Sequence, residues 1–157
     1  MQPKIVERDP EIAIGMGGGY VKQATQQIGQ LWEEFKQRMP EIEDIKPQYA
    51  LGICAQQLSQ ISKSPKDDFV YVAALPVTTV NKIPDGMVKI DIPGGRYAVF
   101  THKGRIADLP KTLDYIWGEW VPSGACKTRS APDLEVYDDR FDPNSTDSEF
   151  DIYIPIE

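Results

Sequence analysis

Apolar and polar side chains alternate along several short stretches of the chain, a period typical of strands with one buried face. These stretches predict strands at residues 4–15, 49–54, 69–75, 87–92, 96–101, 134–137 and 150–156. Two kinds of segment interrupt them. Three consecutive glycines at 17–19 predict a turn after the first strand, and the segment 59–68, rich in serine, lysine and aspartate, predicts an exposed loop.

A helical period of 3.6 occurs twice, over residues 20–39 and 109–121. Each helix is expected to end at a proline, Pro40 or Pro122. The apolar face of the first consists of Ile28, Leu31, Trp32, Phe35 and Met39. The apolar face of the second consists of Leu109, Leu113, Ile116, Trp117 and Trp120. Such stripes most often pack as core against a sheet, which is the interpretation we favour for most of these aromatic residues.

The chain also repeats itself at about half its length. Residues 31–35 (LWEEF) reappear as 116–120 (IWGEW), at an offset of 85, and residues 69–73 (FVYVA) have an echo in 151–155 (DIYIP), at an offset of 82. Self-similarity of this kind indicates one supersecondary unit built twice. We therefore expect a single domain over 1–157, with half-repeats at about 1–80 and 86–157.

Each half contains a strand, a helix and two further strands in that order. This predicts the α+β class, with two pseudo-symmetric strand–helix–strand–strand modules that form a mostly antiparallel sheet and two helices on one face. Two like units packed side by side leave a seam between them. A seam lined with aromatic residues is a natural place for a ligand.

The composition of the chain argues against two classes of binding partner, nucleic acids and membranes. The formal net charge is −7, with 24 acidic and 17 basic residues, which argues against direct nucleic-acid binding. No run of about 18 apolar residues could span a membrane, and the N-terminal segment has no apolar core of a secretory signal. These features predict a cytoplasmic protein.

The residues that most often hold metals or cofactors are sparse. Cys54 and Cys126 lack zinc-ligand spacing, which favours two thiols in a reducing compartment. His102, the one histidine, is expected at the surface or in support of a loop. The carboxyl-rich stretch 133–142 has the oxygen ligands that a hard cation needs, but it is more typical of a solvated strand end. No cofactor and no metal are expected.

The candidate site lies on the strand 134–137. Alternation places Glu135 and Tyr137 on the same face, and a carboxylate in an aromatic-walled seam would bind an organic cation. The alternative, that Glu135 faces water, stays open. At the 85-residue offset its counterpart is Ala50, so the two halves differ chemically. We expect at least one of Trp117 and Trp120 to border a cavity.

Four segments in order, 96–104, 116–122, 132–137 and 152–156, resemble the GyrI-like family, which includes the effector-binding domains of AraC-type and MerR-type multidrug regulators. The resemblance covers essentially the whole chain. It implies lipophilic, often cationic, small-molecule ligands in a cleft between the two helices, with Glu135 and Tyr137 at the family's glutamate and tyrosine positions. Trp117, Trp120 and Tyr71 are the expected further walls.

The leading hypothesis is a non-enzymatic, stand-alone binding domain for hydrophobic, cationic aromatic compounds, because the 157 residues leave no room for a helix-turn-helix domain. Two alternatives follow from the same resemblance. One is a small hydrolase that uses Glu135 as general base and a tyrosine as acid. The other is a gyrase-inhibitor-like module that binds a protein partner. Whether the chain forms a homodimer is left open.

Overall fold

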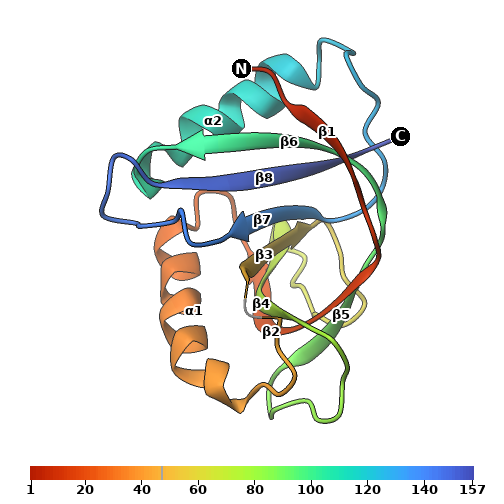
Figure 1. Cartoon of the computed structure of the whole chain (residues 1–157), viewed down its shortest axis with the longest axis vertical. Coiled ribbons are helices and arrows are strands. Elements are labelled where there is room, and N and C mark those ends of the chain that lie inside the picture. The colour runs from red at the N-terminus through yellow and green to blue at the C-terminus, as the bar shows by residue number, and fades with distance from the viewer. Residues whose placement is uncertain (47) are drawn as a thin grey trace.

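The computed structural model describes residues 1–46 and 48–157, which form one eight-stranded sheet and two principal helices (Figure 1). The strand order is β1-β6-β8-β7-β3-β4-β2-β5, and the pairings between these strands are antiparallel. The strands are β1 (Lys4–Arg8), β2 (Glu11–Tyr20), β3 (Ala50–Ala55), β4 (Phe69–Val77), β5 (Val88–Ile92), β6 (Gly95–Lys103), β7 (Asp133–Tyr137) and β8 (Glu149–Ile156). The helices are α1 (Thr25–Arg38) and α2 (Leu109–Tyr115).

The element order occurs twice along the chain. β2, α1, β3 and β4 form the first strand–helix–strand–strand module, and β6, α2, β7 and β8 form the second. β3 and β7 pair at the centre of the sheet, while β1 pairs with β6 and β5 pairs with β2, so each half adds a strand to the other. The predicted α+β class and the doubled module are confirmed.

The N-terminal prediction was wrong in two respects. The expected strand 4–15 is two strands, β1 and β2, and the glycines at 17–19 are part of β2 rather than a turn. A Cβ atom at Gly15 or Gly17 would overlap backbone atoms of β4, so glycine is what allows this close pairing. The first helix consequently begins at Thr25 and not near Tyr20.

The second helix changes its winding along its length. A 3₁₀ turn (Ile106–Asp108) precedes α2, and a π-helical turn (Ile116–Trp120) follows it. The predicted range 109–121 therefore matches the position of the helix but not its uniform α character. Such π turns are rare in proteins, and those that occur are often found at functional sites.

Two layers of core flank the sheet. On one face, α1 packs against β2 and β4, and α2 packs near β6 and β8, each over its own apolar cluster. The opposite face curls inward and encloses a third cluster that includes Leu51, Val72, Tyr97 and Leu134. β3 and β7 run between the two helix-covered halves (Figure 1). Side chains of β7 that point to the helix face therefore enter the seam between α1 and α2.

Candidate functional site

A hydrogen-bonded cluster around Glu135 occupies this seam. The hydroxyl groups of Tyr71 and Tyr137 both donate to Glu135 Oε1, at 2.6 and 2.8 Å. The indole Nε1 of Trp32 donates in turn to the Tyr71 hydroxyl at 3.0 Å. β4, β7 and α1 each contribute to the cluster, so both halves of the repeat build it.

Gly52 makes the central contact geometrically feasible. It lies on β3 between Glu135 of β7 and Ala73 of β4, its partners in the two ladders. A Cβ atom at this position would overlap the Tyr71 hydroxyl and crowd Glu135 Oε1. The missing side chain thus lets Tyr71 reach across β3 to the carboxylate. Gly52 was not among the predicted site residues, although a glycine inside a strand often marks a close approach of another group.

Aromatic rings surround the carboxylate. Trp32 meets Tyr137 edge to face, with ring centroids 5.5 Å apart, and Tyr137 stacks on Phe150 at 4.6 Å. Trp32 was expected to be core, but its indole N–H takes part in the cluster. Trp32 and Trp117 are equivalent positions at the 85-residue offset, and this equivalence was the sequence signal that could have identified Trp32 as a site residue.

The second carboxylate oxygen of Glu135, Oε2, has no hydrogen-bond partner in the part of the chain that the structure describes. Among the described residues no hydrogen bond reaches Oε2, yet no buried side-chain oxygen or nitrogen there lacks a partner. Oε2 must therefore be on the accessible side of the residue, which is itself partly exposed. One oxygen of Glu135 is therefore held in protein hydrogen bonds, and the other is not fully buried.

The electrostatics of the cluster follow from its enclosure. Burial raises the pKa of Glu135 above its ordinary value, and the two tyrosine hydrogen bonds partly oppose that shift. Burial and the nearby carboxylate raise the pKa values of Tyr71 and Tyr137 well above 10. Both hydroxyls therefore stay protonated at neutral pH and act as hydrogen-bond donors.

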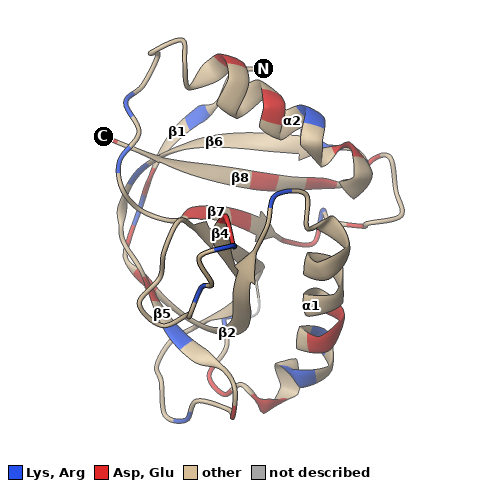
Figure 2. Cartoon of the chain, turned by 180° about the vertical axis from the view of Figure 1, so that it is seen from behind, with Lys and Arg blue, Asp and Glu red and all other residues tan. Residues whose placement is uncertain are grey.

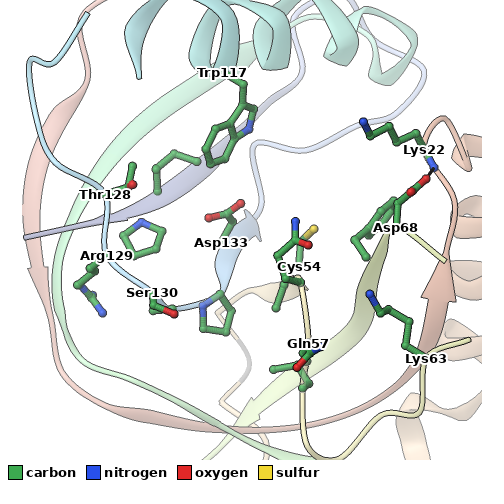
Figure 3. A pocket seen from close by; sticks show the side chains of 18 residues that line it. Lys22, Cys54, Gln57, Lys63, Asp68, Trp117, Thr128, Arg129, Ser130 and Asp133 are labelled. Atoms are coloured by element: carbon green, nitrogen blue, oxygen red, sulfur yellow. Dashed lines mark hydrogen bonds between the residues drawn. The ribbon is translucent and has the colours of Figure 1, made fainter. Parts of the chain in front are cut away.

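A hollow of about 1010 Å³ opens at the start of β7, on the same side of the sheet (Figure 3). Cys54 and Asp133, which face each other across the β3–β7 ladder, line its floor, and Trp117 extends over it from the π-helical turn. Glu135 follows Asp133 on the same face of β7, one pleat or roughly 6.6 Å further along the strand. Figure 2 shows acidic positions on both β7 and β8, but those of β8 alternate with Phe150 and Ile152 and so belong to the opposite face of the sheet. The hollow and the Glu135 cluster thus share one acidic strand.

The predicted site residues fall into three places. Glu135, Tyr137 and Tyr71 come together in one cluster. Trp117 is 45% exposed and borders the hollow, as expected for at least one of the two helix tryptophans. Trp120 is 7% exposed and packs on Phe100 in the core, with ring centroids 5.0 Å apart, so the structure does not bring it to the seam.

The histidine and the two cysteines take no part in the hydrogen bonds of the Glu135 cluster. His102 is buried beneath α2, where its ring nitrogens contact Thr112 Oγ1 at 2.7 Å and the Arg105 carbonyl at 2.9 Å, so it supports a loop and does not lie at the surface. Cys54 and Cys126 are free thiols, and burial raises the pKa of Cys54 to about 12. Across residues 1–46 and 48–157 no histidine, cysteine and carboxylate groups gather as a metal site, and no helix is long and apolar enough to cross a membrane.

Asp133 gives a testable dependence of stability on pH. Burial, and secondarily the charge of Glu135, raises its pKa from 3.8 to about 7. The folded protein then binds more protons than the unfolded chain between these values, so the stability present at low pH is lost as pH rises. We expect Asp133→Asn to raise the free energy of unfolding at pH 8 by up to about 4 kcal/mol, and to change it little at pH 4, in urea titrations.

Asp139→Asn is the control for this prediction, because Asp139 is exposed at the end of the same segment. It should leave stability nearly unchanged at both pH values. An Asp133→Asn effect of equal size at pH 4 and pH 8 would contradict the assignment of a raised pKa to Asp133.

Comparison with known proteins places the chain in a family. Residues 4–156 match the family described as integron-associated effector binding protein (Cass2). The transcriptional regulator BrlR of Pseudomonas aeruginosa is 38% identical over 162 residues, which include 99% of this chain and 56% of BrlR. The chain thus spans about half the length of this regulator.

Solved structures agree on the fold. SAV2435, solved with bound tetraphenylphosphonium, superposes with a TM-score of 0.80 at 19% identity, covering 100% of this chain and 94% of that one. An integron cassette protein of Vibrio cholerae superposes with a TM-score of 0.68 at 19% identity, covering 100% and 97%. The resemblance to the GyrI-like family is confirmed, while the hydrolase and protein-partner alternatives stay predictions. The chain belongs to the integron-associated effector-binding protein family.

Proposed function

We propose that this effector-binding domain binds lipophilic, cationic aromatic compounds in the seam between α1 and α2, with Glu135 as the counter-ion. The observation that carries the proposal is that the two oxygens of the Glu135 carboxylate differ in their hydrogen bonding. Oε1 holds two tyrosine hydroxyls, and Oε2 accepts no hydrogen bond from the described residues. A cation at Oε2 would meet a charge that the protein has already fixed in place.

The surroundings favour an aromatic cation over a hydrated metal ion. Tyr71, Tyr137 and Trp32 lie around the carboxylate, and cation–π contact adds roughly 0.5–2 kcal/mol for each ring whose face a cation reaches. Partial enclosure strengthens the attraction between opposite charges, since fewer water molecules screen it. The tetraphenylphosphonium in SAV2435, a protein of the same fold, is a ligand of this chemistry.

The test is the affinity for tetraphenylphosphonium, measured by calorimetry at pH 8 with wild type and Glu135→Gln. Glutamine keeps an oxygen that can accept the tyrosine hydrogen bonds, so the fold is preserved while the charge is removed. We expect the variant to bind about 10- to 30-fold more weakly, a loss of about 1.4–2 kcal/mol.

Glu149→Gln is the matched control. It removes the same charge from β8, where Glu149 pairs with Lys103 on the opposite face of the sheet from Ile152 and the seam. Its affinity should equal that of the wild type. If Glu135→Gln and Glu149→Gln bind tetraphenylphosphonium equally well, Glu135 is not the counter-ion.

A further inference from the structure

The hollow at the start of β7 holds a second carboxylate that the Glu135 cluster does not use. Asp133 lines the hollow, and its side chain forms no hydrogen bond or ion pair with the described residues. In Figure 3 its carboxylate points into the open space beneath the indole ring of Trp117. An unpaired carboxylate below an exposed indole is a suitable environment for an ammonium or pyridinium group, through charge attraction from one side and cation–π contact from the other.

The spacing of the two carboxylates has a chemical consequence. Asp133 and Glu135 are successive residues on one face of β7, about 6.6 Å apart along the strand. Both are partly enclosed, so their negative charges disfavour each other. One ligand with a single positive charge can neutralise only one of them.

We propose that Asp133 and Trp117 form a second cation subsite, so that the seam prefers rigid aromatic ligands with two positive charges about one strand pleat apart. The proposal rests on the proposed function, because Glu135 supplies the first of the two charges. The expected ligands are therefore dications, and the exposed indole of Trp117 would contact the second positive charge.

The other charged groups around the hollow set the limits of this subsite. Lys22 and Lys63 enter from the opposite side, from the β2–α1 connection and from the loop before β4 (Figure 3). The carboxylate of Asp68 accepts a hydrogen bond from the backbone N–H of Lys22 at 2.8 Å. Arg129 is engaged elsewhere, since its guanidinium donates to two backbone carbonyls and lies over Tyr97. Asp133 is therefore the carboxylate of the lining that is available beneath Trp117.

Protonation gives the subsite a pH dependence. The Cys54 thiol across the ladder stays neutral, because its pKa is raised to about 12. Asp133, with a pKa raised to about 7, is mostly ionised at pH 8 and mostly protonated at pH 5.5. A preference for dications that depends on Asp133 should be present at pH 8 and largely lost at pH 5.5.

The experiment compares two cations of nearly the same shape. Methyl viologen carries two pyridinium charges at its ends, and N-methyl-4-phenylpyridinium replaces one charged ring with a phenyl ring. Affinities of both for wild type, Asp133→Asn, Trp117→Leu and the control Asp139→Asn are measured by calorimetry at pH 8 and pH 5.5. We expect the wild type at pH 8 to bind methyl viologen about 10-fold more tightly than the monocation, and the ratio to fall toward one in Asp133→Asn and at pH 5.5.

Trp117→Leu should lower the same ratio about threefold, and Asp139→Asn should leave it unchanged. Equal affinities of the wild type for the two cations at pH 8, or an unchanged ratio in Asp133→Asn, would overturn the subsite. Tetraphenylphosphonium separates the two proposals. If its binding depends on Glu135 while the viologen ratio is one, the subsite is wrong and the proposed function stands; if its binding is independent of Glu135, the proposed function fails as well.

Discussion

We expect Gly52→Ala to lose tetraphenylphosphonium affinity by about 100-fold and to lower the free energy of unfolding by about 1–3 kcal/mol. The added methyl group would occupy the space where the Tyr71 hydroxyl meets Glu135 Oε1. Tyr71 or Glu135 must move, and a hydroxyl that loses its partner in an enclosed site carries a desolvation cost. The added methyl group therefore disrupts the hydrogen bond that holds the Glu135 carboxylate in place and displaces side chains that line the seam.

Gly18→Ala provides the control, because a Cβ at Gly18 of β2 would meet no described residue within 4 Å other than its two chain neighbours. It tests the general effect of replacing a strand glycine without touching the cluster. Urea titration and calorimetry of both variants give the two quantities. Full tetraphenylphosphonium affinity in Gly52→Ala would show that the Tyr71–Glu135 contact is not needed for binding.

The sequence predicted the architecture well because its main signals were local and repeated. The alternating stretches and the two amphipathic helices place most elements within a few residues of their observed bounds. The turn predicted at glycines 17–19 was wrong, since glycine has the same local preference whether it forms a turn or lets two strands approach closely. Only the position of β4 against β2 decides between the two, and that contact is distant in sequence.

The site was predictable only in part for a related reason. Alternation correctly placed Glu135 and Tyr137 on the face of β7 that enters the seam. The roles of Trp32 and Gly52 depend on how α1 and β3 lie against Tyr71, at sequence separations that no local pattern reports. Trp120 shows the converse, since its place on the helical stripe is shared with Trp117 but the winding of the π turn directs it into the core.

The sign of the ligand's charge is the property that the proposed function depends on most. Tetraphenylphosphonium and tetraphenylborate have nearly the same size, shape and four phenyl rings, and differ in the sign of the central charge. Hydrophobic burial and ring stacking are therefore the same for both. Any difference in their affinities reports the electrostatic contribution of Glu135 and its surroundings.

The most direct test is therefore calorimetric titration of the wild-type protein with each ion at pH 8. With Glu135 as counter-ion, tetraphenylphosphonium should bind at least about 100-fold more tightly than tetraphenylborate, a difference of about 2.8 kcal/mol or more. In Glu135→Gln the ratio of the two affinities should fall by about tenfold, or about 1.4 kcal/mol. Equal binding of the two ions by the wild type, or tighter binding of tetraphenylborate, would contradict a cation site built around Glu135.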